Sequence, residues 1–259
     1  MIKNTDIARA FQLATDFETA PMVIYPMILS EKLNGLRCRY IPGDGFYSKK
    51  GIKWSSAVLE HLIPDTHLSL DCELYAPGMS LQEITTAVGI NRLYPGPRHS
   101  EVRLYAFDVF DTKLNGLERK KLVAESHPTT IPYKLIGSTA AAASELVAVS
   151  KRDGEGIVLQ HPYAPYTAGK TRSCLKLKLF KDGEFNVVGR TEGEGEDKGI
   201  TGSLTCALPN GLTFSVGSGL TVHDQIVFWT RLPARIKVAY ERLSDSGIPL
   251  KPRFIAEEL

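Results

Sequence analysis

Residues that could carry out chemistry occur in five short segments of the chain, and each segment lies beside a strand-like apolar run. In chain order the segments are 30–37, 71–73, 105–108, 153–159 and 175–179. Charged side chains are disfavoured in half-buried strands unless they are paired or take part in binding or catalysis. The five segments are therefore the first candidates for a functional site.

The segment 30–37 reads Ser-Glu-Lys-Leu-Asn-Gly-Leu-Arg, and its lysine follows an apolar run. A lysine becomes a nucleophile where nearby cations or burial favour its neutral form. Gly35 would let a ligand approach the backbone closely. The alternative is a hairpin in which Lys32 and Arg37 are simply solvated.

Carboxylates stand in two of the other segments. Strand geometry places Asp71 and Glu73 on one face and Cys72 on the opposite face. The two like charges repel unless they bind a cation or hydroxyl groups, so a ribose or metal contact is one interpretation, and a water-facing edge strand is the other. Glu155 precedes an apolar strand and is either a site carboxylate or a turn residue.

Aromatic and basic side chains complete the set. Tyr105 and Phe107 share a strand face, where they could stack on a base or belong to the core. Lys176 and Lys178 share a face opposite the leucines of the same strand. Paired strand lysines suit phosphate binding, although they could also protect an edge strand from unwanted pairing.

The order of these segments resembles the covalent nucleotidyltransferases, the superfamily of ATP-dependent DNA ligases, RNA ligases and mRNA capping enzymes. The pattern consists of K-x-N-G-x-R at 32–37, S-K-K-G at 48–51, D-x-E at 71–73, an aromatic-Asp pair at 107–108, E-G-I-V at 155–158 and L-K-L-K at 175–178. The chain most resembles the minimal ATP-dependent DNA ligases of phages and bacteria. The resemblance implies an α+β fold: a nucleotidyltransferase (adenylation) domain over 1–181, with antiparallel sheets and flanking helices, and then a small OB-fold β-barrel over 182–259.

The resemblance also implies a role for individual residues. Lys32 would attack the α-phosphate of ATP and become lysyl-AMP. Glu73 would bind the ribose and Phe107 would stack on adenine, while Lys176 and Lys178 would grip the α-phosphate. The full implied sets are Glu31, Arg37, Lys49, Glu73, Phe107, Lys176 and Lys178 for the nucleotide; Glu155 and Glu73 for Mg²⁺ or Mn²⁺; and Arg37, Lys49, Lys50, Lys251 and Arg253 for DNA.

The expected function is the sealing of 5′-phosphate/3′-OH nicks in duplex DNA through lysyl-AMP and a DNA-adenylate. RNA ligase or capping-type activity is one alternative, and a catalytically weakened nick-binding protein is another. An NAD-dependent ligase is disfavoured, because only 31 residues precede Lys32. A P-loop NTPase is disfavoured because the Walker-like run 164–171 lacks the first glycine and contains Pro165.

Four positions depart from the family pattern. Asn34 stands where an aspartate is usual, and Lys49 stands where an arginine is usual, which keeps the charge but loses the bidentate fork. The loop 194–197 is acidic where ligases are often basic, and Leu250 occupies a position where a basic residue is expected. These departures concern reaction rate and nick affinity more than family membership.

The composition of the chain indicates the class of protein in which these motifs occur. The 259 residues are 43% hydrophobic and 23% charged, which is typical of a globular protein. No run approaches the ~18 apolar residues that span a bilayer, and the four cysteines are widely spaced, so we expect a cytoplasmic protein, with a monomer as the expected state. Residues 1–181 carry 23 basic and 18 acidic side chains, whereas 182–259 carry 8 and 11, so any polyanion must be bound by local clusters.

Periodicity and capping residues predict the elements that position the motifs. Helices are expected at 6–14, 55–62, 80–89, 117–124 and 138–149. Strands are expected at the motif segments, including 175–180. After 181, several short strands with one helix at 221–231 suit a small barrel of the oligonucleotide-binding type.

Overall fold

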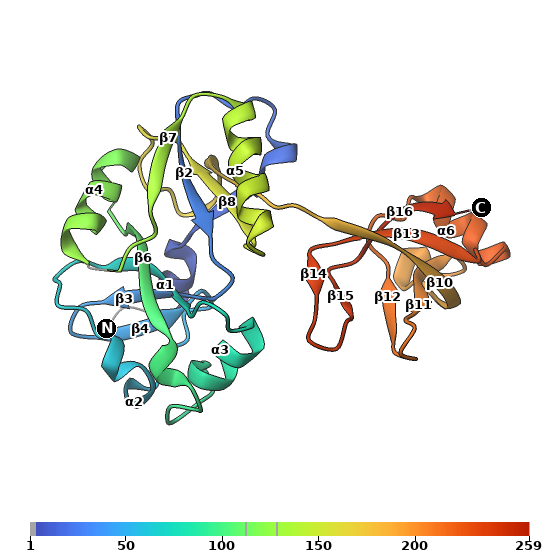
Figure 1. Cartoon of the computed structure of the whole chain (residues 1–259), viewed down its shortest axis with the longest axis horizontal. Helices are drawn as coiled ribbons and strands as arrows, with labels where there is room; N and C mark the ends of the chain where they lie inside the picture. The colour runs from blue at the N-terminus through green and yellow to red at the C-terminus, as the bar shows by residue number, and fades with distance from the viewer. Residues whose placement is uncertain (1–3, 112, 128, 259) are drawn as a thin grey trace. The chain divides into compact units, whose positions relative to one another are not determined.

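The computed structural model describes residues 4–111, 113–127 and 129–258 of the chain. The chain forms two compact units, Met1–Lys178 and Leu179–Leu259, and each is described by itself. The first unit combines two mostly antiparallel sheets with flanking helices, and the second is a five-stranded sheet with one helix (Figure 1). The α+β class expected from the sequence is confirmed.

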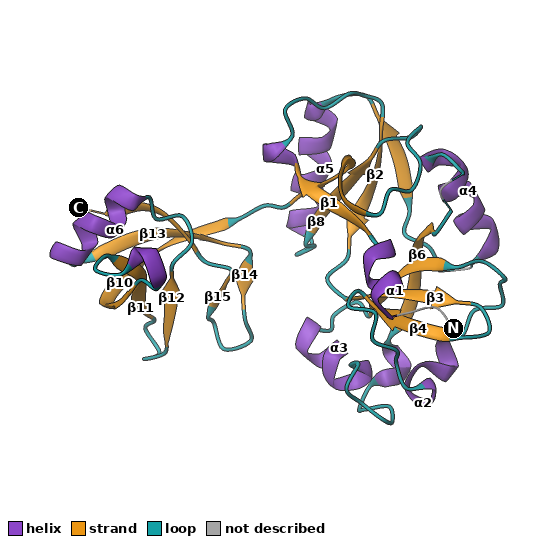
Figure 2. Ribbon diagram, turned by 180° about the vertical axis from the view of Figure 1, so that it is seen from behind, coloured by secondary structure: helices purple, strands orange, loops and turns teal. Residues whose placement is uncertain are grey.

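The first unit begins with a helix and then alternates strands with short helices (Figure 2). Its elements are α1 (Asn4–Ala10), β1 (Gln12–Asp16), η1 (Phe17–Thr19), β2 (Met27–Lys32), β3 (Leu36–Ile41), β4 (Gly45–Ser48), α2 (Ser56–Leu59), η2 (Glu60–Leu62), β5 (Leu70–Tyr75), α3 (Leu81–Val88), η3 (His99–Glu101), β6 (Arg103–Val109), α4 (Gly116–Ser126), β7 (Tyr133–Ile136), α5 (Thr139–Lys151), β8 (Gly156–Gln160) and β9 (Gly169–Leu177).

The strands of the first unit form two sheets. One has the order β1-β9-β8-β2-β7 and the other the order β4-β3-β5-β6. The pairing of β1 with β9 is parallel, whereas the remaining pairings in both sheets are antiparallel. Helix α5 covers the first sheet at β8, and α4 packs on β6 of the second. Each sheet therefore has a helix-covered face and a face that is free to form a site.

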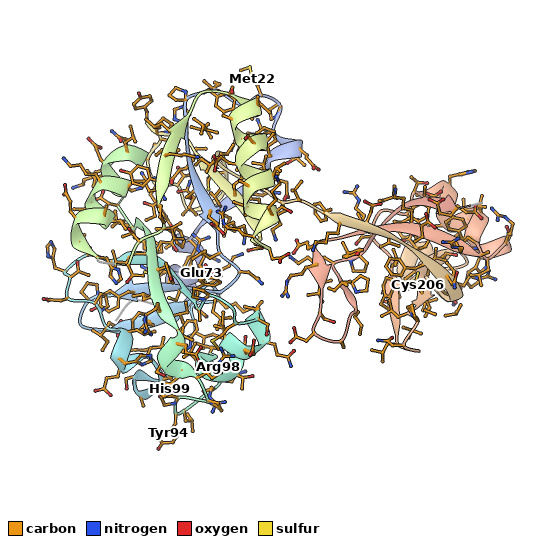
Figure 3. All side chains as sticks on the ribbon, viewed as in Figure 1. Met22, Glu73, Tyr94, Arg98, His99 and Cys206 are labelled. Carbon is orange, nitrogen blue, oxygen red and sulfur yellow. The ribbon has the colours of Figure 1, made fainter. Side chains whose placement is uncertain are left out.

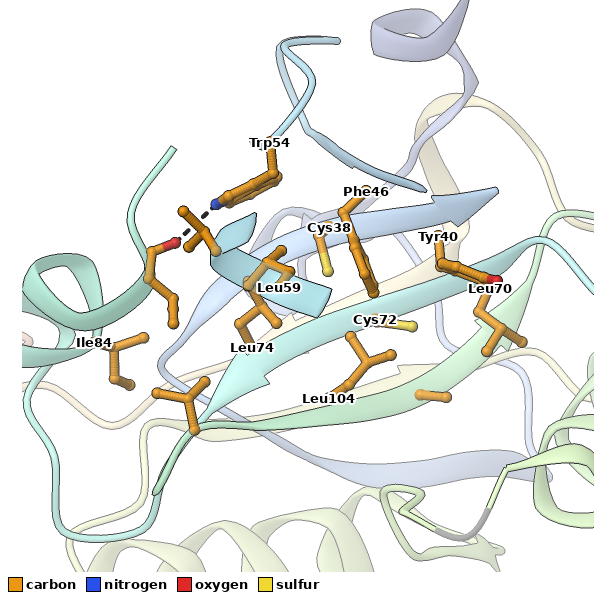
Figure 4. Packing of buried hydrophobic residues seen from close by; sticks show 14 of the residues in the cluster. Cys38, Tyr40, Phe46, Trp54, Leu59, Leu70, Cys72, Leu74, Ile84 and Leu104 are labelled. Atoms are coloured by element: carbon orange, nitrogen blue, oxygen red, sulfur yellow. Dashed lines mark hydrogen bonds between the residues drawn. The ribbon is translucent and has the colours of Figure 1, made fainter. Parts of the chain in front are cut away.

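The core of the four-stranded sheet explains how its charged residues are oriented. Cys38 and Cys72 are directly paired across β3 and β5, and both are fully buried against α2 and α3 residues (Figure 4). Trp54 closes this core and donates its indole N–H to the carbonyl of Val88 at 2.8 Å. Because side chains alternate along a strand, the burial of Cys72 directs Asp71 and Glu73 to the opposite face, as predicted.

Helix boundaries follow the capping residues that the sequence displays. Ser80 and Glu83 form a reciprocal capping box at the start of α3, and the helix ends before Gly89, as expected. Ser138 caps α5 by accepting from the backbone N–H of Ala141, again as expected. Local hydrogen bonding was sufficient to place these two helices.

Two predicted elements have different bounds in the structure. The helix expected over 6–14 ends at Ala10, and residues 12–14 belong to β1. Gln12 is paired with Gly169, a partner 157 positions away that no local pattern reveals. The strand expected over 175–180 begins at Gly169 and ends at Leu177, because β1 and β8 pair with that longer range. Tertiary pairing overrode local periodicity at both places.

The second unit consists of a five-stranded antiparallel sheet, one inserted helix and a separate two-stranded sheet. Its elements are β10 (Lys181–Glu192), η4 (Gly195–Asp197), β11 (Thr201–Ala207), β12 (Thr213–Val216), α6 (Val222–Thr230), β13 (Arg235–Tyr240), β14 (Arg242–Leu243), β15 (Pro249–Leu250) and β16 (Arg253–Glu258). The main sheet has the order β12-β11-β10-β13-β16. Over the described part of the chain, only the single bridge Ser218–Arg253 joins its two ends, so the expected barrel is incompletely closed.

Two further findings bear on the sequence expectations. The four cysteines are free thiols, and three of them are buried in the cores. Within the described ranges, no helix has the length and apolar character needed to cross a bilayer.

Candidate active site

A pocket lies in the first unit between the free faces of its two sheets. Figure 3 shows Glu73 in the middle of this unit. The pocket is lined by Gln12, Ala14, Ser30, Glu31, Lys32, Leu33, Arg37, Asp71, Glu73, Phe107, Asp108, Lys120, Ile131, Val158, Gln160, Tyr166, Cys174 and Lys176. Both sheets contribute residues to this lining. Apart from Lys32, the sequence assigned seven residues to the nucleotide, and five of them line the pocket: Glu31, Arg37, Glu73, Phe107 and Lys176.

Lys32 is the last residue of β2 and lies at this pocket. Its ammonium donates to Oε2 of Glu155 at 2.5 Å, and the ammonium of Lys178 lies 2.5 Å from Oε1 of the same carboxylate. One carboxylate thus joins two lysines that the sequence placed in separate motifs. Glu155 and Lys178 are not among the pocket-lining residues. Glu155 therefore binds Lys32 from outside the pocket lining, and Lys178 binds the same carboxylate.

Two motif glycines make this arrangement sterically possible. A Cβ on Gly35 would lie 2.2 Å from the carbonyl oxygen of Leu74, so only glycine lets the turn after Lys32 approach β5. Gly156 has φ +153°, and a Cβ there would lie 2.2 Å from the carbonyl oxygen of Leu177. Because Gly156 is also the register partner of Lys32, a larger residue would displace the strand that holds the lysine.

Lys176 enters the pocket from β9. Its ammonium lies 3.1 Å from a carboxylate oxygen of Asp16 on β1, and the lysine is paired in register with Val158. β9 ends at Leu177, so Lys178 follows the strand rather than continuing it. The two lysines predicted to act together therefore have different partners, Asp16 for the first and Glu155 for the second.

Arg37 is held by a buried carboxylate. Its guanidinium donates from Nε to Oδ1 of Asp71 at 2.9 Å and from Nη2 to Oδ2 at 2.5 Å, and Asp71 is completely buried. The hydroxyl of Tyr166 donates to Oδ2 of Asp71 at 2.7 Å. Burial raises the pKa of Asp71, while the charge of Arg37 opposes that shift. The fork geometry fixes the arginine above the pocket.

Glu73 lines the same pocket as Arg37. The backbone N–H of Gly35 donates to its Oε1 at 3.1 Å. Burial raises the pKa of Glu73 to about 7, although the charges of Lys32 and Arg37 act in the opposite direction. The Glu73 carboxyl group therefore takes part in hydrogen bonding, and its charge changes near neutral pH.

Phe107 lines the pocket and contributes an aromatic ring to it. The guanidinium of Arg37 lies 5.3 Å from the centre of its ring. Tyr105, the other aromatic candidate, instead packs edge-to-face against Tyr75 and is not a lining residue. A β-bulge at this point of the β5–β6 pairing separates the two aromatic positions.

The remaining predicted residues lie at the margin of the pocket or outside it. Glu31 lines the edge and binds Arg152 at 2.6 Å. Lys49 and Lys50 are exposed in the turn after β4 and do not line the pocket. The pairing of Cys38 with Ser48 places this turn at the Arg37 end of β3.

The two predicted DNA contacts of the second unit are on its surface. Lys251 lies in the turn before β16, and its ammonium binds Glu241 at 2.9 Å. Arg253 is an exposed residue of β16. The acidic run 194–197, at and beside η4, is also exposed.

Sequence reasoning missed several residues of the pocket wall. Lys120 is buried on α4 and donates to the carbonyl of Phe107 at 2.6 Å, and burial lowers its pKa. Asp108 belongs to the aromatic-Asp motif, but sequence reasoning assigned it no role; it accepts from the guanidinium of Arg119 at 2.7 Å and from the amide of Gln160 at 2.9 Å. The sequence offered one signal for these residues. Arg119 and Lys120 are charged residues that interrupt the apolar face of a helix.

Two carboxylates of the site, those of Glu73 and Glu155, are candidates for holding a metal ion. Within the described ranges, no group of three or more His, Cys, Asp or Glu side chains could hold an ion unaided. Glu155 and Glu73 interact electrostatically across the site, which gives two carboxylates. Mg²⁺ is commonly held by one or two carboxylates together with substrate phosphates, so the residues present fit this ion when a nucleotide is bound.

Comparison with known proteins agrees with this architecture. A family model described as the DNA ligase OB-like domain matches residues 192–257. A curated DNA ligase of Haemophilus influenzae is 31% identical over 238 residues, covering 88% of this chain and 84% of that protein. The chain belongs to the DNA ligase family. The match spans both units, so membership covers the pocket as well as the second sheet.

Solved structures of DNA ligases share the fold of this family member. A structure from a structure-function study of Lig E DNA ligases has a TM-score of 0.81 at 23% identity and covers 95% of this chain and 98% of its own. A Chlorella virus DNA ligase-adenylate has a TM-score of 0.54 at 21% identity, covering 96% and 97%. The ATP-dependent DNA ligase of bacteriophage T7, in complex with ATP, has a TM-score of 0.52 at 11% identity, covering 98% and 100%.

Proposed function

We propose that this DNA ligase family member uses ATP to seal nicks with a 5′-phosphate and a 3′-OH in duplex DNA. The observation that carries the proposal is the position of Lys32, which combines a place in the wall of the inter-sheet pocket with an ion pair to Glu155. An amine at the edge of a pocket that also presents an aromatic ring and a second lysine suits transfer of a nucleotidyl group to nitrogen.

In the first step, the Nζ of Lys32 attacks the α-phosphorus of ATP. The P–N bond forms, the P–O bond to the β-phosphate breaks, and pyrophosphate leaves. The ammonium first loses one proton so that Nζ has a lone pair, and Oε2 of Glu155 at 2.5 Å is the group placed to accept it. The second proton, released as the P–N bond forms, leaves with pyrophosphate. Lys176 and Lys178 offset the negative charge of the transferred phosphoryl group and of the leaving group.

The later steps transfer AMP from Lys32 to the 5′-phosphate of the nick, after which the 3′-OH attacks and AMP leaves. We assign Phe107 to stacking on adenine, Glu73 to the ribose, and Arg37 to the ribose and the nick. Lys49 belongs to the same set through its place beside Arg37 in the β3–β4 hairpin. Glu31 holds the pocket edge through its pair with Arg152.

A divalent ion, Mg²⁺ or Mn²⁺, would be held by Glu155 and Glu73 together with the phosphates of the nucleotide. When bound, it would supply positive charge to the phosphoryl oxygens. Both oxygens of Glu155 are engaged by Lys32 and Lys178, so ion binding and the lysine pairs share one carboxylate.

The proposal extends to the partner and the setting. Arg37, Lys49, Lys50, Lys251 and Arg253 would contact phosphates of the nicked duplex, since basic side chains supply most sequence-independent DNA affinity. Residues 1–181 would form the nucleotidyltransferase domain and 182–259 the OB-fold domain. We propose a cytoplasmic monomer.

The test follows the label from ATP into nucleic acid. The protein is incubated with Mg²⁺ and ATP labelled at the α-phosphate, and nicked DNA, nicked RNA and capping acceptors are then supplied in parallel. The expected results are label on the peptide containing Lys32 and sealing of nicked DNA. Lys32→Ala should lower labelling by about 10³-fold or more, because the nucleophile is removed.

Lys237→Ala is the matched control, since Lys237 forms a surface ion pair with Asp182 in the second unit. It should be labelled like the wild type. Label that survives Lys32→Ala would contradict the assignment of the nucleophile, and preference for an RNA acceptor would contradict the assignment of the substrate.

A further inference from the structure

Gln12 is an unusual side chain in the wall of the pocket. It is the first residue of β1 and is 5% exposed. Neither Oε1 nor Nε2 of its carboxamide has a hydrogen-bond partner among the described residues. The backbone N–H of Gln12 is satisfied, because it donates to the hydroxyl of Tyr166 at 2.8 Å. The strand is therefore anchored, while the side chain has two unused hydrogen-bonding atoms.

Two other buried polar side chains of the pocket wall have hydrogen-bond partners. The amide of Gln160 donates to Asp108, and the ammonium of Lys120 donates to the carbonyl of Phe107. Buried polar atoms without partners are rare in native proteins, and each one lowers the stability of the fold. A side chain that is kept in this state while it faces a binding pocket suggests a partner that arrives with the ligand.

The surroundings of Gln12 indicate which part of a nucleotide that partner would be. The sheet register orders the residues on the pocket face from Lys32, which is paired with Gly156, through Val158 to Gln160 along β8. Gln12 and Ala14 occupy β1 on the far side of β9. In the proposed function Lys32 and Lys176 bind the phosphates, and Phe107 and Val158 supply apolar surface to the pocket. Gln12 thus stands apart from the lysines, on the side where a base would lie.

We propose that Gln12 recognises the adenine of the bound nucleotide by accepting a hydrogen bond from its 6-amino group. This inference rests on the proposed use of ATP. A carboxamide presents one acceptor and one donor side by side, which matches an adenine edge that offers the 6-amino donor beside a ring-nitrogen acceptor. Because no group of the described residues pairs with the amide, the nucleotide satisfies both atoms without first displacing another protein group.

Selectivity against a nucleotide without the 6-amino group follows from the same geometry. Sites built to hydrogen-bond a substrate group discriminate against analogues that lack it, because the protein atom is then left unpaired. Guanine is rejected less strongly by Gln12 alone, since rotation of the amide exchanges its donor and acceptor.

The experiment compares two nucleotides on two variants. Formation of lysyl-AMP, or of its purine riboside counterpart, is measured as kcat/KM with ATP and with purine riboside 5′-triphosphate, which carries hydrogen in place of the 6-amino group. Gln12→Met replaces the amide with an apolar side chain of similar length. Gln82→Met makes the same chemical change at an exposed position of α3 and is the control.

The expected result is a selective loss. The wild type and Gln82→Met should favour ATP over the analogue by about 10-fold, the order expected for one buried hydrogen bond and its unpaired partner. Gln12→Met should lose about 10-fold more activity with ATP than with the analogue, because the analogue offers the amide only the ring-nitrogen acceptor. Equal losses with both nucleotides, or no loss with either, would overturn the proposal.

Thermal unfolding without nucleotide provides an independent readout. If the amide is unpaired in the free protein, Gln12→Met removes an unfavourable burial and should raise the Tm by about 2–4 °C. A lower Tm together with an unselective loss of activity would mean that the amide has a structural role only, and would overturn the proposal.

The wild type alone also tests the proposal if Gln12→Met does not fold. Equal kcat/KM for ATP and the analogue in the wild type would refute recognition of the 6-amino group. If the wild type forms no lysyl-AMP from ATP, the proposed function fails and this inference fails with it. Normal labelling from ATP without selectivity at Gln12 would remove only the inference.

Discussion

The two units of the chain differ in their ion pairs: both have pairs on the surface, and the first unit also has buried pairs. In the first unit, Arg37 is paired with Asp71, whose side chain is 0% exposed, and Arg119 is itself 0% exposed beside Asp108. In the second unit the pairs are on the surface: Arg231, 57% exposed, binds Glu257. Buried pairs cannot exchange partners with water, so the first unit holds its charges in fixed positions.

The difference indicates where each unit does its work. A buried charge costs free energy that only an accurately placed partner offsets, and such an arrangement is retained where geometry matters. Exposed pairs contribute little and can yield to another partner, such as a phosphate. The first unit therefore holds buried charges in fixed positions, whereas the second unit presents replaceable charges on a compact apolar core.

The largest expected effect on stability comes from Asp71→Asn. The substitution leaves the guanidinium of Arg37 partly buried without a counter-charge, and it should lower the free energy of unfolding of the first unit by about 3 kcal/mol. The measurement is urea unfolding followed separately for each unit. Lysyl-AMP formation should fall in parallel, because Arg37 would no longer be fixed.

Glu257→Gln is the matched change in the second unit. It weakens the pair with Arg231 at the surface and should cost no more than about 1 kcal/mol. A cost as large as that of Asp71→Asn would show that the two units do not differ in the way their burial suggests.

A smaller effect is expected from Glu73→Gln, and it depends on pH. The folded pKa of about 7 lies above the ordinary glutamate pKa of 4.5. The folded state therefore binds more protons than the unfolded state between these values, and stability falls as the pH rises through this window. From pH 5.5 to 8 the contribution should be a loss of about 1–2 kcal/mol, which Glu73→Gln removes.

The check is the difference in the pH dependence of unfolding between wild type and variant, because other groups titrate in both proteins. Parallel curves for the two proteins would show that Glu73 does not titrate in this range. A wild type that gains stability relative to the variant as the pH rises would contradict the direction of the shift.

The smallest effect is expected from Lys251→Ala and Arg253→Ala in the second unit. Both residues are exposed, so each change should alter the free energy of unfolding by less than about 0.5 kcal/mol. If each side chain contacts a phosphate, nick binding should weaken about equally for all sequences. The slope of log affinity against log salt should fall by about 1 per residue. An unchanged salt slope would remove these residues from the DNA contact set.

The residues that the sequence identified are those whose chemistry is visible in local order. Gly35 lies three residues after Lys32, and Gly156 directly follows Glu155. These short spacings identify both charged residues as site candidates from the sequence. Strand alternation likewise predicted that Asp71 and Glu73 share a face opposite Cys72. The same reasoning could not assign Asp71 its partner, because Arg37 is its diagonal neighbour across two strands that only the register brings together.

Gln12 illustrates the opposite case. Its local sequence reads as helix, and a glutamine at that position suggests no chemistry. It enters a strand because Gly169 and the residues after it offer a parallel partner, and it enters the pocket because that strand lies at the edge of the site-forming sheet.

The sequence by itself determined the family, the α+β class and the helix caps, because these depend on residue types at short, fixed separations. Only the tertiary structure decided that Glu155 joins Lys32 to Lys178, that Lys120 and Gln12 line the pocket, and where β1 and β9 begin and end. The reason is physical: burial and pairing between residues far apart in the chain set these features, and no local propensity encodes a partner more than 100 positions away.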